Sequence, residues 1–149
     1  MTDGLPGSIL FACNRNTIRS AMAEAIMKHL VGHRVYVDSA GVQLTDEQAD
    51  PFAIAAMREI DMDMSAHRAK SFDDLSDDSV DLIIALTPQA QLRAVEFTQT
   101  IACDVEYWPL MDPGDVTGPR EVQLEAYREL RDTLFEKIKA RFPDPDRTI

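Results

Sequence analysis

Hydrophobic residues along the chain gather in short runs, and the segments between these runs place their apolar residues three or four positions apart. Apolar runs without alternation are typical of strands that are buried on both faces, as in a parallel sheet. Three runs predict strands and a shorter, weaker run predicts a fourth, at residues 8–12, 34–39, 81–86 and 105–108.

The segments between the runs carry the start and stop signals of helices. Residues 20–31 have apolar positions at helical spacing and are followed by Gly32, which suits a helix end. Asp50-Pro51 and Thr87-Pro88 each combine an N-cap residue with a proline for the first turn. The helices that these pairs open have apolar residues at Ile54, Met57 and Ile60 and at Leu92 and Val95.

The longest predicted helix follows Gly118-Pro119 and continues to about Phe142. Its other face is charged, and its apolar stripe consists of Tyr127, Leu130, Leu134 and Ile138. Strands that alternate with helices indicate βαβ units, whose right-handed crossovers place helices on both sides of a parallel sheet. We predict an α/β fold with a doubly wound, four-stranded, flavodoxin-like parallel sheet, in a single domain of residues 1–149 with a frayed tail at 143–149.

Composition argues against several classes of function. With 149 residues, 45% of them hydrophobic, the chain can form a core, and its net charge of −11 repels nucleic acids and anionic membranes. No apolar stretch approaches the roughly 20 residues of a membrane span, and the N-terminus does not resemble a signal peptide. Two cysteines, Cys13 and Cys103, do not make a disulfide framework, so we expect a cytoplasmic protein.

The histidines, the second cysteine and the clustered acidic residues do not predict a further functional site. The histidines are scattered, so we predict no metal site and expect surface or helix-end positions for His29, His33 and His67. Cys103 is expected to be a buried core thiol. An acidic patch is interpreted as a solvated turn and short helix before the third strand, and it consists of Asp73, Asp74, Asp77, Asp78 and Asp81.

The segment after the first strand carries the strongest chemical signal. A loop between a strand and a helix can point several backbone N–H groups inward, and with the helix N-terminus they form an anion site. We therefore predict that this loop binds phosphate. It consists of Cys13, Asn14, Arg15, Asn16, Thr17, Ile18 and Arg19, and Ser20 follows at the start of the helix.

Single side chains of this loop suit a nucleophilic attack on phosphorus. The positive field of the loop favours the thiolate of Cys13, which is the nucleophilic form. The planar guanidinium of Arg19 can hold two phosphoryl oxygens and offset charge that develops in the transition state. The Ser20 hydroxyl can donate to the thiolate, and Asn16 tolerates a positive φ if the loop requires one.

Phosphate ester cleavage also needs an acid that protonates the leaving oxygen. Asp112 is our candidate, because it follows the fourth predicted strand and so belongs to the same end of the sheet as Cys13. Pro113 restricts the backbone of Asp112 and could fix the direction of its side chain. Asp112 could equally be an ordinary turn residue, and Asp115 is the second candidate for the acid.

Together these residues resemble the low-molecular-weight protein tyrosine phosphatases and the arsenate reductases that share their fold. The resemblance covers almost the whole chain: residues 13–20, the helix start Ser20-Ala21-Met22-Ala23-Glu24-Ala25, Asp38-Ser39-Ala40-Gly41, Asp112-Pro113 and the long last helix. It implies a four-stranded parallel sheet and no metal or organic cofactor. Asn16 and Ser39 look like residues that hold the shape of the loop, and His67-Arg68 resembles a segment that supports it in relatives.

The resemblance also implies a reaction in two steps. Cys13 takes the phosphoryl group while Asp112 protonates the leaving oxygen, Arg19 binds the phosphate and Ser20 stabilises the thiolate. Water activated by Asp112 then releases phosphate from the cysteinyl-phosphate intermediate. The expected substrate is a phosphorylated protein, with phosphotyrosine as the first expectation, or a small-molecule phosphate ester.

Three positions depart from the family pattern. Arg15 stands where glycine is usual and could add phosphate affinity or disturb the loop. Ile18 replaces a frequent cysteine and removes a thiol that could protect Cys13. Gly114-Asp115 replaces the aromatic residues that flank a phosphotyrosine ring in many relatives, which weakens the expectation of phosphotyrosine.

Two other functions stay open at this point. Arsenate fits the same loop, so the chain could be an arsenate reductase; because Cys103 is the only other cysteine, this reductase would need an external small thiol. Alternatively, Arg15 could have spoiled catalysis and left a phosphate-binding protein.

Overall fold

The computed structural model describes residues 5–75 and 79–144. Its four strands are all parallel and form one sheet in the order β2-β1-β3-β4. This arrangement confirms the predicted four-stranded parallel α/β fold. The strands are Ser8–Cys13 (β1), Tyr36–Gly41 (β2), Leu82–Ala85 (β3) and Asp104–Tyr107 (β4).

Four α-helices connect or follow the strands. They are Arg19–Val31 (α1), Pro51–Arg58 (α2), Pro88–Phe97 (α3) and Arg120–Arg141 (α4). Single turns of 3₁₀ helix occur at Phe72–Asp74 (η1) and Pro113–Asp115 (η2). None of the helices among residues 5–75 and 79–144 is long and apolar enough to cross a membrane.

The predicted helix starts are confirmed at α2 and α3. The Asp50 carboxylate accepts hydrogen bonds from the N–H groups of Phe52 and Ala53, and the Thr87 hydroxyl accepts one from Ala90. These side chains satisfy backbone donors that have no partner within a helix. Gly32 is the C-cap of α1 as expected, but its φ of −62° is right-handed, so the helix end does not use the conformational freedom of glycine.

The second strand begins later than predicted. The N–H groups of Arg34 and Val35 both donate to the carbonyl of Val31, so these residues close the turn after α1 instead of extending β2. The strand continues to Gly41, whose Cα is the register partner of Cys13 in β1. As a result, β1 and β2 end side by side, next to the predicted phosphate loop.

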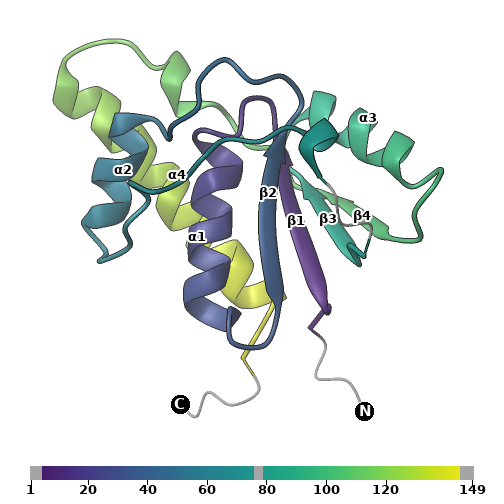
Figure 1. Ribbon diagram of the computed structural model, residues 1–149. Coiled ribbons are helices and arrows are strands. Elements are labelled where there is room, and N and C mark those ends of the chain that lie inside the picture. The colour runs from purple at the N-terminus through teal and green to yellow at the C-terminus, as the bar shows by residue number, and fades with distance from the viewer. Residues whose placement is uncertain (1–4, 76–78, 145–149) are drawn as a thin grey trace.

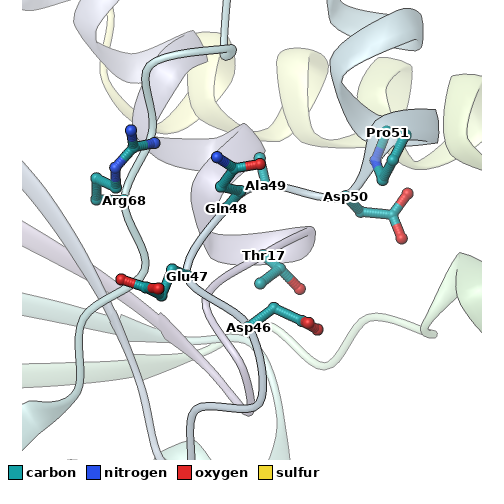
Figure 2. Close-up of a pocket in the computed structure, with 8 residues that line it drawn as sticks. All are labelled: Thr17, Asp46, Glu47, Gln48, Ala49, Asp50, Pro51 and Arg68. Carbon is teal, nitrogen blue, oxygen red and sulfur yellow. The ribbon is translucent and has the colours of Figure 1, made fainter.

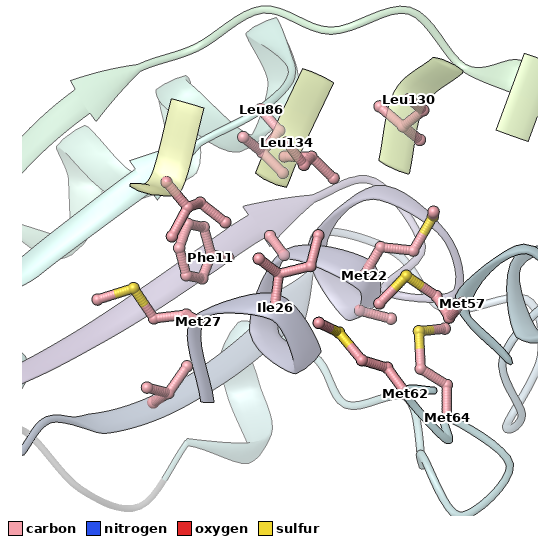
Figure 3. Close-up of a cluster of buried hydrophobic side chains, with 14 of the residues drawn as sticks. Phe11, Met22, Ile26, Met27, Met57, Met62, Met64, Leu86, Leu130 and Leu134 are labelled. Atoms are coloured by element: carbon pink, nitrogen blue, oxygen red, sulfur yellow. The ribbon is translucent and has the colours of Figure 1, made fainter. Parts of the chain in front are cut away.

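Helices cover both faces of the sheet, as predicted (Figure 1). On one face α1 packs against β1, β2 and α4, and α4 also packs against α2. The core on this face is rich in methionine (Figure 3) and includes Phe11, Met22, Met27, Met57 and Leu134, all below 2% exposed. Each such side chain contributes about 1.5–3 kcal/mol through the removal of apolar surface from water.

The other face of the sheet carries a smaller core under α3. Small residues of the helix, Ala90 and Ala94, pack against Leu10 and Ile83 of the sheet. Leu92 and Val95, the apolar residues that marked this helix in the sequence, are 71% and 47% exposed, so the buried face was not the one they suggested. Alanine side chains are small and let the helix pack closely against the sheet. The alanine face of α3 is therefore the buried one, although Leu92 and Val95 are more hydrophobic.

The acidic patch contains a short helix, as predicted, in the form of η1, and its carboxylates make more contacts than a solvated turn implies. Asp81 accepts a hydrogen bond from the N–H of Ser8 at 3.1 Å, Asp73 pairs with Arg93 at 3.1 Å, and Asp74 caps η1. Asp77 and Asp78 lie outside the described residues, as do residues 145–149 of the predicted frayed tail.

Candidate functional site

The predicted phosphate loop connects the carboxyl end of β1 to α1. Cys13 is the last residue of the strand and Arg19 the first of the helix. Among the described residues, the N–H groups of Arg15, Thr17 and Ile18 have no acceptor. The N-terminus of α1 has neither a side-chain cap nor an acidic residue in its first turn. Unpaired amides at a helix N-terminus are the groups that bind an anion such as phosphate.

The sulfur of Cys13 lies at the base of this loop and is surrounded by donors. The Ser20 Oγ atom is 2.9 Å from Cys13 Sγ, and the N–H of Asn16 donates to the sulfur at 3.3 Å. Ser20 Oγ already accepts from Asn16 Nδ2 at 2.8 Å, so the Ser20 hydrogen is free to point at the sulfur. Two donors are thus aimed at one sulfur atom at the base of the loop.

Asn16 fixes the shape of the loop from inside the protein. Its φ is +61°, the left-handed conformation that asparagine tolerates, and the residue is fully buried. Asn16 Nδ2 donates to Ser20 Oγ and Ser39 Oγ, and Asn16 Oδ1 accepts from the N–H of Lys70 at 3.0 Å. All side-chain groups of Asn16 are therefore bonded, and the predicted loop-supporting pair, Asn16 and Ser39, lies in direct contact.

Two further residues complete this buried network. His67 Nε2 is 2.7 Å from the carbonyl of Asn16, and since a carbonyl only accepts, His67 must carry a proton on Nε2. Ser39 donates to Glu24, and His67 Nδ1 is 4.0 Å from the same carboxylate. His29 and His33 are exposed, as expected for surface histidines, but His67 is a support of the loop.

The Glu24 carboxylate stays charged within this network. Burial alone would raise the pKa of Glu24, but hydrogen bonds from Lys28 and Ser39 and the charges of Lys28 and Lys70 outweigh burial and lower the pKa. Glu24 therefore remains an acceptor for Ser39 at neutral pH. The sequence did not assign Glu24 a role, because Ser39, His67 and Lys70 reach it from β2 and from the segment before η1.

Residues that follow β2 and β3 contact the loop from two sides. The N–H groups of Val42 and Gln43 donate to the carbonyls of Cys13 and Asn14. A Cβ atom on Gly41 would lie 2.8 Å from the backbone carbon of Arg15, so only glycine fits there. On the other side the Thr87 hydroxyl, already the N-cap of α3, donates to Asn14 Oδ1 at 2.7 Å.

Arg19 reaches across to the segment that follows β4. Its NH1 donates to the carbonyl of Leu110 at 3.0 Å, and its NH2 lies 3.8 Å from Asp112 Oδ2. Asp112 Oδ1 accepts from the N–H of Gly114 at 2.8 Å, which fixes the carboxylate at the start of η2. The fold thus brings Arg19 and Asp112 together. Asp115, the second candidate acid, is exposed and has no ion pair with Arg19 among the described residues.

The remaining loop residues differ in their surroundings. Arg15, which replaces the usual glycine, is exposed, and among residues 5–75 and 79–144 it has no hydrogen-bond or ion-pair partner. Ile18 and Thr17 are buried. The backbone of Asn16 rather than that of Arg15 adopts the positive φ, so a bulky cation at position 15 is compatible with the loop.

A cavity of 530 Å³ adjoins the loop (Figure 2). It is lined by Thr17, Asp46, Glu47, Gln48, Ala49, Asp50, Pro51 and Arg68. Of these residues, the sequence had singled out only Thr17 as part of the phosphate loop.

Cys103 lies far from the loop. It precedes β4, whereas Cys13 ends β1, and in a parallel sheet these positions are at opposite ends. Cys103 is half-buried rather than buried, and it packs beside the smaller core. Burial and the neighbouring Asp104 and Asp81 raise the pKa of its thiol. Within the described part of the chain no cluster of histidine, cysteine and acidic residues could hold a metal ion.

Comparisons with known proteins agree with this geometry. The family described as low molecular weight phosphotyrosine protein phosphatase matches residues 8–143. A glutaredoxin arsenate reductase of Synechocystis is 30% identical over 132 residues, which cover 88% of this chain and 92% of the relative. A low molecular weight protein tyrosine phosphatase of T. tengcongensis has a TM-score of 0.72 at 26% identity, with 89% of this chain and 95% of that chain covered. The arginine phosphatase YwlE has a TM-score of 0.68 at 25% identity, with 93% and 97% covered.

Proposed function

Because this chain belongs to the low molecular weight phosphotyrosine protein phosphatase family, we propose that it is a cysteine-dependent phosphatase that hydrolyses phosphate monoesters. The observation that carries this proposal is the position of the Cys13 sulfur, which lies 2.9 Å from the Ser20 hydroxyl and 3.3 Å from the Asn16 amide. A sulfur that receives two donors at the base of an open ring of amides is suited to attack a bound phosphoryl group.

The proposed reaction proceeds in two steps. In the first, the Cys13 thiolate forms a bond to phosphorus as the bond from phosphorus to the leaving oxygen breaks, and Asp112 gives its proton to that oxygen. The unpaired N–H groups of Arg15, Thr17 and Ile18 and the Arg19 guanidinium hold the three phosphoryl oxygens. In the second step, Asp112 takes a proton from water, the water oxygen attacks phosphorus, and the Cys13 thiolate leaves with a hydrogen bond from Ser20.

The substrate that we propose is a phosphorylated protein, with phosphotyrosine as the first choice. The family description and the T. tengcongensis enzyme support this choice. The reaction needs a reduced thiol at Cys13, which the reducing cytoplasm would maintain, and we propose that location.

Arsenate reduction is the second candidate, and the curated relatives favour it. The Synechocystis protein is a glutaredoxin arsenate reductase, and an Oceanobacillus iheyensis relative is an arsenate reductase. In this chain Cys13 and Cys103 lie at opposite ends of the sheet, so a disulfide cannot pass between them. A reductase would therefore need an external thiol as reductant.

One set of assays separates these functions. We expect release of p-nitrophenol from p-nitrophenyl phosphate, with a loss of about 10⁴-fold or more in Cys13→Ser because the oxygen nucleophile is not activated in this loop. Arsenate-dependent consumption of glutathione without ester hydrolysis would identify the reductase instead. Inorganic phosphate binding with neither activity would identify a phosphate-binding protein and contradict both enzymes.

A further inference from the structure

Tyr127 of α4 lies beside the turn that holds the proposed acid. The residue is 3% exposed, and α4 packs against η2, the turn that follows Asp112. A Cβ atom on Gly114 would lie 3.5 Å from the Tyr127 hydroxyl and 3.1 Å from Asp112 Oδ1. Because glycine has no side chain, the phenol and the carboxylate approach the same small space from two sides.

The same phenol contacts the start of α2, which is bonded to the phosphate loop. Asp50 caps α2 with its carboxylate, and its backbone N–H donates to the Thr17 carbonyl at 3.0 Å. Burial, the charges of Asp50 and Asp112 and a hydrogen bond to Asp50 raise the pKa of Tyr127. The phenol therefore stays protonated at neutral pH and donates its hydrogen to Asp50. Tyr127 thus connects a residue that bonds the phosphate loop with the turn that carries the acid.

The ring of Tyr127 is held in place independently of its hydroxyl. Phe52 stacks on the ring with 5.3 Å between the centroids and 26° between the planes. The Arg120 guanidinium in turn lies 5.3 Å from the centroid of the Phe52 ring. Because these contacts involve the ring and not the oxygen, removal of the hydroxyl alone should leave the ring in its place.

The two carboxylate oxygens of Asp112 have different surroundings. Oδ1 accepts from the N–H of Gly114 at 2.8 Å, whereas Oδ2 lies 3.8 Å from Arg19 NH2. Oδ2 is therefore the oxygen that faces the phosphate site and can give a proton to a leaving oxygen. Where Oδ2 stands depends on how Oδ1 is held, and the Tyr127 hydroxyl bounds the space next to Oδ1.

We propose that Tyr127 is a positioning residue of the reaction, because its hydroxyl, fixed by Asp50, sets where the Asp112 carboxylate stands relative to the phosphate loop. This inference rests on the proposed phosphatase function. Tyr127 makes no contact with the substrate in this proposal and acts only through Asp112. In the sequence it belongs to the apolar stripe of the last helix, where its ring is typical of a core residue and its hydroxyl gives no signal.

The test measures kcat/KM of Tyr127→Phe for phenyl phosphate and p-nitrophenyl phosphate. Phenoxide is a poor leaving group and needs the acid, whereas p-nitrophenoxide leaves with little help. We expect kcat/KM to fall about tenfold for phenyl phosphate and about twofold or less for p-nitrophenyl phosphate. Inhibition by inorganic phosphate should be unchanged, because the loop itself is intact. A purely structural role would lower both rates equally and weaken the binding of inorganic phosphate.

A double-mutant cycle separates action through Asp112 from any other effect of Tyr127. In Asp112→Asn the acid is already absent, so the addition of Tyr127→Phe should change kcat/KM for phenyl phosphate by about twofold or less. A further tenfold loss in the double variant would overturn the proposal. The matched control is Tyr36→Phe, which removes an exposed hydroxyl at the start of β2, at the opposite end of the sheet from Cys13. We expect this control to leave both rates unchanged.

A second variant, Gly114→Ala, changes the same space from the other side. Gly114 does not have a positive φ, so alanine fits its backbone. The atoms nearest to the added methyl group all belong to the side chains of Asp112 and Tyr127, so the carboxylate must shift while the backbone is kept. We expect kcat/KM to fall about fivefold for phenyl phosphate and by less for p-nitrophenyl phosphate. Equal changes for the two esters would show that this space does not position the acid.

Failure of the proposal is distinct from failure of the phosphatase. Hydrolysis of both esters with equal losses in Tyr127→Phe would overturn the role of Tyr127 and leave the phosphatase standing. If the wild type hydrolyses neither ester, the phosphatase fails, and crystal structures of the wild type and of Tyr127→Phe test the position of Asp112 directly. Asp112 Oδ2 should then lie farther from Arg19 NH2 in the variant than the 3.8 Å of the wild type. A carboxylate that stays in place would overturn the inference.

Discussion

The phosphate loop has a buried side and an open side, which differ in how their polar groups are satisfied. On the buried side, Asn16, Ser20 and Ser39 are fully buried and bonded to one another. On the open side, Arg15 is exposed, and Arg19 lies 3.8 Å from Asp112, beyond a direct hydrogen bond. The buried side fixes the conformation of the loop, whereas the charged groups of the open side remain available to bind a ligand.

This difference predicts that substitutions on the two sides have separate effects on the free energy of unfolding and on the catalytic rate. A change on the buried side leaves polar groups without partners and should cost stability as well as activity. A change on the open side removes groups with few partners in the protein and should mainly lower the catalytic rate. The following variants test that separation, from the largest expected effect to the smallest.

Arg19→Lys should have the largest effect among these variants. Lysine keeps the charge but loses the planar fork that holds two phosphoryl oxygens, so we expect kcat/KM for p-nitrophenyl phosphate to fall about 10³-fold. The free energy of unfolding should change by less than about 1 kcal/mol, because Arg19 donates one hydrogen bond, to Leu110. A drop in stability comparable with the loss of rate would place Arg19 on the buried side.

Asp112→Asn should have the second largest effect. Asparagine cannot protonate the leaving oxygen, so we expect kcat for phenyl phosphate to fall about 10²-fold, and less for p-nitrophenyl phosphate, whose leaving group needs less help. Asp115→Asn is the matched control, since Asp115 is exposed and belongs to the same turn. A larger loss in Asp115→Asn than in Asp112→Asn would reverse the assignment of the acid.

Asn16→Ala examines the buried side. Alanine removes the bonds to Ser20, Ser39 and the Lys70 amide and must still adopt a φ of 61°. We expect a loss of about 2–4 kcal/mol in the free energy of unfolding, measured with urea, together with most of the activity. Arg15→Ala, one residue away on the open side, should change stability by less than about 0.5 kcal/mol. Equal losses in the two variants would remove the distinction between the two sides.

Glu24→Gln should have the smallest effect and a characteristic pH dependence. The folded protein lowers the pKa of Glu24 below its ordinary value of 4.5, so the charged carboxylate stabilises the fold above that pH. This contribution is lost as the pH falls below 4.5 towards the lowered pKa. We expect the wild type to exceed the variant by about 1–2 kcal/mol at pH 7, and thermal unfolding should show the gap closing between pH 5 and pH 3. A gap that grows on acidification would contradict a lowered pKa.

Much of the fold follows from local signals in the sequence. Short apolar runs without alternation predicted four strands, of which β4 is only partly buried, and Asp50-Pro51 and Thr87-Pro88 predicted two helix starts, because caps depend on a few adjacent residues. Strand ends were less predictable, as β2 shows, because the turn after α1 includes Arg34 and Val35. The buried face of α3 was missed, because alanine carries little hydrophobic signal although it packs closely.

The candidate site likewise has one part that the sequence predicted and one part that it did not. Cys13, Arg19 and Ser20 are within eight residues of one another, so their spacing alone predicted a phosphate loop. Glu24, His67 and Thr87 support that loop from distant parts of the chain, and no local pattern marks them.

By itself, the sequence determined the sheet and the helix starts and predicted the loop of residues 13–19, because each depends on the local preferences of consecutive residues. Only the tertiary structure decided which acid meets Arg19, which histidine supports Asn16, and that Thr17 shares a cavity with Asp46 and Asp50. Those contacts join segments far apart along the chain. Their geometry is set by how strands and helices pack against each other, which the order of residues within any one segment does not contain.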